Sequence, residues 1–396
     1  MSHSDCAHVL VIGASAAGLS TVESLRRKGY QGEITVLGDE WHMPYDRPPL
    51  SKQVLSGAWE PDRVQLRSAQ DIRSLGAEFL LGDAATGLDV ESRTVRTRSG
   101  RTLSADAIVI ATGVRPRTLP GQSDLAGVHV MRTVEDSLAL GAALGEGVRL
   151  VVVGEGVLGS EIAATARTLG ADVTIAGPLS APMAMQVGPL VAGALGELHT
   201  ERGVRLRLGT GVRELSGHQG RVAGVRLATG EELPADLVVV AIGAIPSTQW
   251  LQDSGIRLDN GVVCDARCRA ADGIYAVGDV ARWEHEKFGL IRLENRTNAT
   301  EQAAAVAEGI LGSDRPYVPV PYFWTDQFDA KLQVHGVLRP EAEVQVVEGE
   351  VAARRFVAVY RTDGLVTGVL GWNMPKQTRL RRQEILDALF TPSPIS

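Results

Sequence analysis

The chain of 396 residues is too long for one compact core, and usual domain sizes predict roughly two to three domains. Its formal net charge of −7 argues against nucleic-acid binding, which needs a basic face, while 44% hydrophobic residues and 44 glycines are typical of a soluble α/β protein. We expect no signal peptide and no membrane span, because the first residues lack a cationic region and no apolar run approaches about 18 residues. The three cysteines, Cys6, Cys264 and Cys268, suit a reducing cytoplasm.

Residues 8–38 predict a dinucleotide-binding unit. The apolar run "HVLVIG" reads as a buried parallel strand, "AAGLSTVESLRRKG" as a helix ending at Gly29, and "EITVLG" as the next strand. The turn between strand and helix is Gly13-x-Ser15-x-x-Gly18, a pattern in which small residues let the backbone approach a pyrophosphate and let the helix pack on the strand. Asp39 and Glu40 follow the second strand, where carboxylates accept ribose hydroxyls.

A proline-rich segment, "PYDRPPLSKQ" (44–53), follows this unit. Prolines fix φ and remove backbone donors, so the segment is neither an ordinary helix nor a central strand. It predicts a stiff, irregular stretch that presents Arg47 and Lys52.

The nucleotide-binding pattern occurs twice. At 149–170, "RLVVVGEGVLGSEIAATARTLG" repeats the strand, the turn Gly154-x-Gly156-x-x-Gly159 and the helix, and "ADVTIAG" supplies another strand. One such turn is weak evidence, but two complete units about 140 residues apart favour two bound dinucleotides. The strands "ADAIVIATGVRPR" (105–117) and "ADLVVVAIGAIPS" (235–247) also repeat each other and are expected to close the two units. Beyond Pro316, aromatic and β-rich segments predict an α+β domain closing near Ile385.

The order of the turn at Gly13–Gly18, "PYDRPPLSK", "ATG", "GEGVLGSE", "YAVGDV", "ENRTNATEQA" and "FWTDQF" resembles the FAD-dependent ferredoxin reductases of bacterial oxygenase systems, relatives of putidaredoxin reductase, aromatic dioxygenase reductases and apoptosis-inducing factor. The resemblance covers essentially the whole chain. It implies an α/β, glutathione-reductase-like fold with two Rossmann-type domains and an α+β C-terminal domain. The implied parts are an FAD domain at 1–115 and 245–318, an NAD(P) domain at 116–244 and a C-terminal domain at 319–396.

The resemblance also implies cofactor contacts. Arg47 would contact FAD, and Lys52 would lie near the flavin ring, where a cation stabilises the anionic reduced flavin. Trp324 would lie near the isoalloxazine, although a core tryptophan is an equal alternative. The other expected FAD residues are Gly13, Ala14, Ser15, Ala17, Gly18, Asp39, Glu40, Ala85, Ala111, Thr112, Gly113, Arg117, Gly278, Asp279, Glu294, Asn295 and Arg296.

For the second nucleotide, the resemblance implies that Gly154, Gly156, Leu158, Gly159 and Gly243 hold NAD and that Glu161 lies near the nicotinamide. Two positions depart from the family pattern. Gly177 stands where the family usually has the acid that binds the adenosine ribose, and no arginine for a 2′-phosphate follows in "LSAPMAMQ" (179–186). NADH is our first choice, with NADPH as the alternative. Arg296 stands where many relatives have tryptophan, and it could stack on a ring, pair with a phosphate or point to solvent.

The sequence also bears on how electrons leave the flavin. No cysteine lies in the proline-rich segment, where disulfide reductases of this fold place theirs, and Cys264 and Cys268 are expected to be buried and structural; we expect no metal site. The resulting hypothesis is transfer from NADH through FAD to a ferredoxin that feeds an oxygenase, with Lys52 and Glu161 tuning the site. Ferredoxin is expected to dock near Arg379, Arg381 and Arg382, although a solvated helix face is the commoner fate of such residues. The alternatives are a quinone or oxygen reductase and a redox-responsive binding protein.

Overall fold

The computed structural model describes residues 6–339 and 341–390, which form two compact units. The first unit contains the chain up to Asp46, Val64–Arg115 and Ile245–Pro319. The second contains Arg47–Arg63, Pro116–Ala244 and the residues from Val320 onward. The chain passes from one unit to the other within β8 (Val114–Pro116) and β17 (Ala244–Pro246).

The first unit is built on a six-stranded sheet in the order β19-β20-β7-β1-β2-β3. The sheet is parallel from β20 to β3, and β19 is an antiparallel edge strand. Its strands are β1 (His8–Ile12), β2 (Glu33–Leu37), β3 (Glu78–Leu80), β7 (Ala107–Ile110), β19 (Arg269–Ala271) and β20 (Ile274–Ala276). β1 lies inside the sheet with Val9–Ile12 at most 2% exposed, which explains why its sequence is apolar without alternation.

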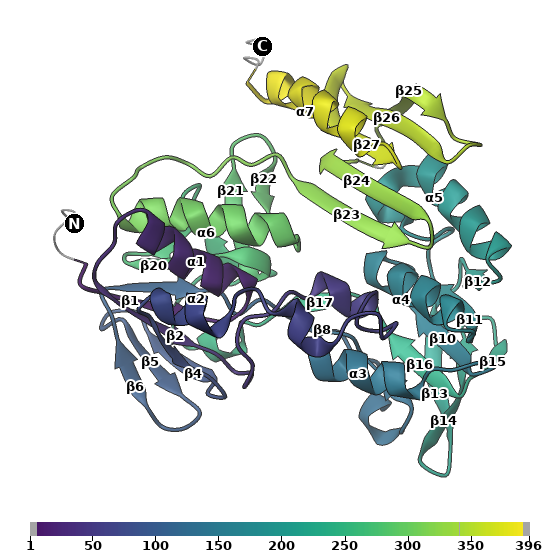
Figure 1. Ribbon diagram of the computed structural model, residues 1–396, viewed down its shortest axis with the longest axis horizontal. Coiled ribbons are helices and arrows are strands. Elements are labelled where there is room, and N and C mark those ends of the chain that lie inside the picture. Colours follow the sequence, from purple (N-terminus) through teal and green to yellow (C-terminus); the bar gives the residue numbers. More distant parts are fainter. Residues whose placement is uncertain (1–5, 340, 391–396) are drawn as a thin grey trace. The chain divides into compact units, whose positions relative to one another are not determined.

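Two helices pack with this sheet in one hydrophobic core. Figure 1 shows α1 (Ala16–Arg27) and α6 (Arg296–Ile310) side by side, and small residues such as Ala17 and Ala299 are buried in that core. The remaining elements of the unit are two small sheets, η4 (Gln249–Leu251), η5 (Gly278–Val280) and α2 (Ala69–Ser74). The sheets are β4 (Ala85–Asp89), β5 (Thr94–Thr97) and β6 (Thr102–Ser104), and β18 (Val262–Cys264), β21 (Ala281–His285) and β22 (Gly289–Ile291).

The second unit repeats this plan with a five-stranded parallel sheet in the order β12-β11-β10-β16-β9. Its strands are β9 (Val128–His129), β10 (Arg149–Val153), β11 (Asp172–Gly177), β12 (Arg205–Leu208) and β16 (Leu237–Val240). The other elements are α3 (Val134–Ala143), α4 (Val157–Thr168), η1 (Pro48–Ser51), η3 (Gln122–Asp124) and an antiparallel sheet of β13 (Val212–His218), β14 (Arg221–Leu227) and β15 (Glu232–Pro234). The 3-10 turn η2 (Pro61–Val64) lies where the chain returns from the second unit to the first.

The internal duplication extends to the order of the elements. In each unit the strand before the glycine turn pairs on one side with the next parallel strand and on the other with a later one, as β1 does with β2 and β7 and β10 does with β11 and β16. A three-stranded antiparallel sheet precedes β7 and another precedes β16. The predicted pair of Rossmann-type units is confirmed.

The second unit also holds a five-stranded antiparallel sheet in the order β23-β24-β27-β26-β25. It shares a buried core with α5 (Ala184–Glu201), whose Leu195 and Leu198 pack with Phe356 and Trp372. The strands are β23 (Tyr322–Gln327), β24 (Ala330–Gly336), β25 (Glu343–Glu350), β26 (Arg355–Thr362) and β27 (Leu365–Trp372). The last helix, α7 (Pro375–Phe390), packs on β27 and β24.

None of the helices within residues 6–339 and 341–390 combines the length and apolar character that crossing a membrane requires.

Burial of His335 on β24 makes the second unit sensitive to acid. Burial, with a contribution from Arg382, lowers the pKa of His335 to about 4, and its ring stacks on Tyr322 at 4.7 Å between centroids. In the unfolded chain the His335 ring takes up a proton near pH 6.5. The contribution of the neutral, buried ring to the free energy of unfolding is therefore fully present above that pH and is lost as the pH falls toward 4.

We expect His335→Phe, which keeps a ring beside Tyr322 but cannot take the proton, to reduce the fall in melting temperature between pH 7 and pH 5. The effect is on the order of 1–2 kcal/mol, or a few degrees. Differential scanning calorimetry at both pH values tests this, with exposed His218→Gln as the control. An unchanged acid sensitivity in His335→Phe would contradict the assignment.

Candidate active site

Close backbone approaches fix the first glycine turn. A side chain at Gly13, where φ is 122°, would place its Cβ 2.2 Å from the Ala111 carbonyl oxygen, and a Cβ at Gly18 would lie 1.9 Å from the Gly13 oxygen. Both positions therefore require glycine. Ser15 caps α1 without a side-chain hydrogen bond, so no cap side chain competes with an anion for the first amides of the helix.

The second turn obeys the same constraints. Gly154 has a φ of 114°, and its Cβ would lie 2.3 Å from the Ala241 oxygen; a Cβ at Gly159 would lie 2.0 Å from the Gly154 oxygen. At Gly156 nothing lies within 4 Å of a built Cβ. Protein packing therefore does not explain glycine there, whereas close approach of a ligand to the backbone does. The residues fit a pyrophosphate at both turns.

The first unit gathers three predicted flavin segments at one edge of its sheet. β1, β7 and β20 are parallel neighbours, so their carboxyl ends share an edge. The glycine turn follows β1, Ala111–Gly113 follows β7, and Gly278 and Asp279 follow β20. The Gly278 amide, at a φ of 72°, donates to Gln302 Oε1 at 2.8 Å, which holds that chain reversal in place.

The two acids after β2 have partners in the same unit. Asp39 forms a 2.6 Å ion pair with Arg98, and both side chains are more than half exposed. Glu40 accepts a hydrogen bond from the Tyr45 hydroxyl at 2.5 Å. The exposed pair is weak by nature, so a ribose can compete with Arg98 for Asp39. Ala85, a further predicted contact, is the first residue of β4.

Arg296 is held by an ion pair. Its Nε lies 2.6 Å from Asp46 Oδ1, and its Nη1 donates to Thr300 Oγ1 at 2.5 Å. This pair ties the start of α6 to the end of "PYD", and the role of Arg296 toward a cofactor stays a prediction. The preceding Asn295 is the cap of α6 without a side-chain cap bond, and Glu294 pairs with Arg292 at 2.7 Å.

In the second unit, side chains of α3 and α4 clamp the proline-rich segment. Its 48–51 stretch forms the 3-10 turn η1, in agreement with the prediction of a stiff irregular segment. Ser137 Oγ donates to the Leu50 carbonyl at 2.7 Å, and Thr165 Oγ1 donates to the Ser51 carbonyl at 2.8 Å. Arg47 Nη1 donates to the Arg132 carbonyl at 2.6 Å.

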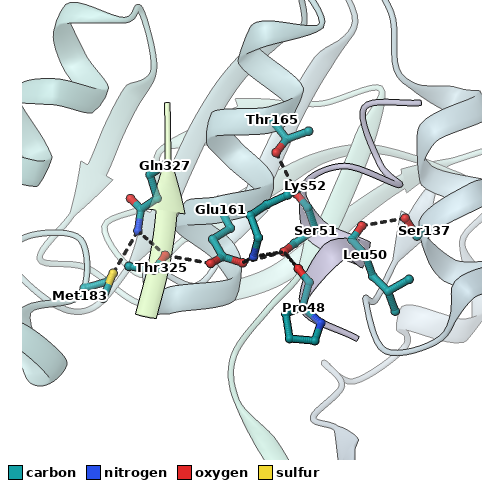
Figure 2. Close-up of polar contacts among 10 residues, drawn as sticks. All are labelled: Pro48, Leu50, Ser51, Lys52, Ser137, Glu161, Thr165, Met183, Thr325 and Gln327. Carbon is teal, nitrogen blue, oxygen red and sulfur yellow. Dashed lines mark hydrogen bonds and ion pairs between the residues drawn. The ribbon is translucent and has the colours of Figure 1, made fainter. Parts of the chain in front are cut away.

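The clamped segment carries Lys52 to Glu161 on α4. Figure 2 shows the contacts: Lys52 Nζ lies 2.7 Å from Glu161 Oε2, and Ser51 Oγ donates to the same oxygen at 2.6 Å. Thr325 of β23 donates to Glu161 Oε1 at 2.8 Å. The Lys52 and Glu161 side chains are only 13% and 7% exposed. The pair is therefore a buried, hydrogen-bonded ion pair, in which loss of either partner strands a charge.

The polar network continues behind Thr325. Gln327 Nε2 donates to Thr325 Oγ1 at 3.2 Å and contacts Met183 Sδ at 3.1 Å, and its Oε1 lies 2.8 Å from His199 Nε2. With Gln327 Oε1 as the acceptor, the proton of His199 lies on Nε2. Burial lowers the pKa of His199, so the ring is neutral and orients the amide without adding a charge to the core.

The other predicted residues of this unit have contacts of their own. Trp324 neighbours Thr325 on β23 and therefore projects from the opposite face, where it stacks with Tyr322 at 6.0 Å. The Arg117 amide donates to the Gly243 carbonyl at 2.9 Å, so these two residues, assigned to different cofactors from the sequence, are neighbours. Leu158 lies in the first turn of α4.

The cysteines are not nucleophiles. Cys264 and Cys268 are 4% and 0% exposed, and burial raises the pKa of both thiols, to about 12 for Cys268. Both remain protonated at neutral pH, in agreement with the expected structural role. No group of three or more metal-ligating side chains occurs within the described part of the chain.

Sequence reasoning missed Ser51, Thr325, Asp46 and Glu155. Ser51 and Thr325 are separated by more than 270 positions, so no local pattern could connect them to Glu161. Glu155 carried a signal, because a buried acid between the first two glycines of a phosphate-binding turn is unexpected. Its carboxylate lies beside Gly177, where the sequence itself carries no acid.

The chain matches two family models: pyridine nucleotide-disulphide oxidoreductase over residues 7–307 and reductase C-terminal over residues 322–392. It is 36% identical to rhodocoxin reductase of Rhodococcus erythropolis, over 95% of this chain and 88% of that protein. It is 38% identical to the benzene 1,2-dioxygenase system ferredoxin–NAD(+) reductase subunit of Pseudomonas putida, over 94% and 91%. The crystal structure of the covalent putidaredoxin reductase–putidaredoxin complex matches with a TM-score of 0.91 and 32% identity, over 96% of this chain and 93% of that chain.

We expect Lys52→Met to lower the melting temperature by an amount corresponding to about 3 kcal/mol, because it leaves the Glu161 carboxylate buried beside two hydroxyls alone. Adding Glu161→Gln removes that charge and should recover part of the loss. Thermal denaturation of wild type, both single variants and the double variant measures the coupling. Additive losses would show that the ion pair contributes nothing.

Proposed function

Because the chain belongs to the pyridine nucleotide-disulphide oxidoreductase family, we propose that it is a flavoprotein reductase that takes electrons from NADH through FAD and passes them to a small iron–sulfur ferredoxin feeding an oxygenase. Its relatives rhodocoxin reductase and the benzene 1,2-dioxygenase system subunit support this class of activity. The free thiols fit a reducing cytoplasmic compartment.

The observation that carries the proposal is the Lys52–Glu161 ion pair on a segment without cysteine. A disulfide reductase needs a thiol beside the flavin, whereas this segment offers an ammonium, a hydroxyl and a clamped backbone. The buried thiols of Cys264 and Cys268 do not substitute for such a relay. Electrons therefore leave without a protein-bound disulfide step.

The chain supplies binding and orientation. FAD, when bound, accepts two electrons as a hydride and releases them one at a time, which matches a one-electron ferredoxin. The amides of Ser15–Gly18 would hold the pyrophosphate, and Asp39 or Glu40 would accept from the adenosine ribose. Lys52 donates to Glu161 Oε2 at 2.7 Å and to Ser51 Oγ at 3.4 Å, which leaves one N–H that would serve a polar atom of the cofactor. By the family resemblance, Trp324 would lie near the ring system.

The second turn binds the nicotinamide nucleotide. Gly156 leaves the space that a pyrophosphate needs, and Gly154 and Gly159 hold the turn and α4 close to β10. Glu161 lies on the same helix, two positions after Gly159, so its fixed carboxylate is a positioning group near the nicotinamide rather than a proton donor: its oxygens already accept three hydrogen bonds.

We expect rapid anaerobic flavin reduction by NADH in stopped flow, and NADH-driven cytochrome c reduction that rises at least about tenfold on adding putidaredoxin or the benzene dioxygenase ferredoxin as probe. Flavin bleaching and steady-state turnover measure the two half-reactions. Fast turnover with oxygen or a quinone and no gain from either ferredoxin would instead support a quinone or oxygen reductase. Slow bleaching with a change in oligomeric state would favour a redox-responsive binding protein.

We further propose that an acidic ferredoxin docks over the basic surface of α7. Arg379 and Lys376 are exposed there, whereas Arg381 is half-buried and pairs with Glu384 at 2.7 Å, and Arg382 faces His335. The exposed cations of α7 are therefore Arg379, from the cluster expected from the sequence, and Lys376.

Reversing both charges, Lys376→Glu with Arg379→Glu, should raise the KM for ferredoxin several-fold at low salt and flatten its salt dependence, because steering acts on encounter. The control is Arg213→Glu, an equally exposed arginine on β13 of the same unit. If the KM and its salt dependence match wild type, ferredoxin docks elsewhere.

A further inference from the structure

The end of β11 is where a nucleotide-binding unit reads the adenosine ribose. In this chain β11 ends at Gly177, and the strand is a parallel neighbour of β10, which leads into the turn Gly154–Gly159. The Gly154 amide donates to the Ala176 carbonyl at 2.8 Å, so the first residues of the turn lie against the last residues of β11. Whatever occupies the space over Gly177 therefore faces the same ligand as the turn.

That space is filled by Glu155. A Cβ built on Gly177 would lie 1.7 Å from Glu155 Oε2 and 2.4 Å from its carboxyl carbon. Glycine is thus present at 177 because the carboxylate of residue 155 takes the volume that a side chain at 177 would use. The sequence has no acid at the end of β11, but the carboxylate of Glu155, from the turn Gly154–Gly159, lies at that position in space.

The first unit shows that this adjacency is built into the fold. Ala14 occupies the place in the first turn that Glu155 has in the second, and Gly38 follows β2 as Gly177 ends β11. A Cβ on Gly38 would lie 2.7 Å from Ala14 Cβ. In both units the residue after the first glycine reaches over the end of the next strand. Only in the second unit does it carry a charge.

Glu155 is held for binding rather than left in solvent. The residue is 4% exposed, and Oε1 accepts from the Leu179 amide at 2.7 Å, while its own carbonyl accepts from the Met183 amide at 2.7 Å. No donor in the described part of the chain is hydrogen-bonded to Oε2, the oxygen above Gly177. A buried carboxylate with one open acceptor suits the two hydroxyls of an unphosphorylated ribose.

We propose that Glu155 is the specificity-determining residue of the second nucleotide site: it accepts hydrogen bonds from the adenosine ribose and repels a 2′-phosphate, which makes the chain selective for NADH over NADPH. This proposal rests on the proposed function only for the assignment of the second turn to a nicotinamide nucleotide. On the adjacent strand β12, Arg205 pairs with Asp172 at 2.8 Å and Arg207 pairs with Glu231 at 2.9 Å.

The test uses ADP-ribose and 2′-phospho-ADP-ribose, the non-redox fragments that carry the distinction, titrated calorimetrically into the FAD-loaded protein. Wild type should bind ADP-ribose at least about tenfold more tightly than its 2′-phosphate. Glu155→Gln keeps the Leu179 contact and the volume but removes the charge, and should bring the ratio below about threefold. The control is Glu146→Gln, an exposed acid before β10 rather than after it.

Relocating the acid tests the geometry. Gly177→Glu alone should lose both ligands, because its side chain collides with Glu155. Glu155→Gly combined with Gly177→Glu should restore the wild-type ratio. An unchanged ratio in Glu155→Gln overturns the proposal, as does a wild type that binds neither fragment, which would also remove the premise of NADH oxidation. If wild type shows the expected ratio of affinities for the two fragments but reduces no ferredoxin, the proposed function is wrong and the assignment of Glu155 stands.

Discussion

The burial of the Glu161 carboxylate is the constraint on which the second unit depends. A charge taken from water at this depth needs opposite charge and hydrogen bonds, and the chain supplies them from three distant segments: Lys52, Ser51 and Thr325. Those partners bind a proline-rich insertion and an antiparallel sheet to the helix of a nucleotide-binding turn. The carboxylate thus adds a polar tie between segments that are far apart in the sequence.

The two nucleotide-binding turns have the same backbone conformation but carry different side chains. Gly13 and Gly154 face the same steric limit against a neighbouring carbonyl, as do Gly18 and Gly159 against the turn itself, so these four positions have no freedom. The residue after the first glycine is free of that limit. It is alanine at 14 and glutamate at 155, and the paired glycine on the next strand makes room for either side chain. The backbone of the turn is thus fixed by its first and last glycines, while the side chain after the first glycine can differ in charge.

Much of the fold was predictable because it follows local rules. Apolar runs without alternation predicted β1 and β10, and the glycine spacing predicted both turns, since these signals lie within a few consecutive residues. Family resemblance identified Lys52 and Glu161 singly. Their direct contact was not predictable, because residues 52, 161 and 325 meet only through tertiary packing. Arg296 illustrates the same limit: its partner, Asp46, is 250 positions away. The carboxylate beside Gly177 was missed because the sequence was searched at the usual position rather than at its neighbour in space.

The contacts around Glu161 also decide what kind of residue it can be. A general acid or base needs an oxygen free to exchange a proton, yet Oε2 accepts from a hydroxyl and an ammonium and Oε1 accepts from Thr325. Hydride acceptance and one-electron release need no proton from this carboxylate. Behind Thr325, Gln327 and the neutral His199 continue the network without adding a charge, so the whole chain of contacts can hold one arrangement through a redox cycle. A rigid support of this kind keeps the ammonium of Lys52 in one place, which is what a preorganised charge requires.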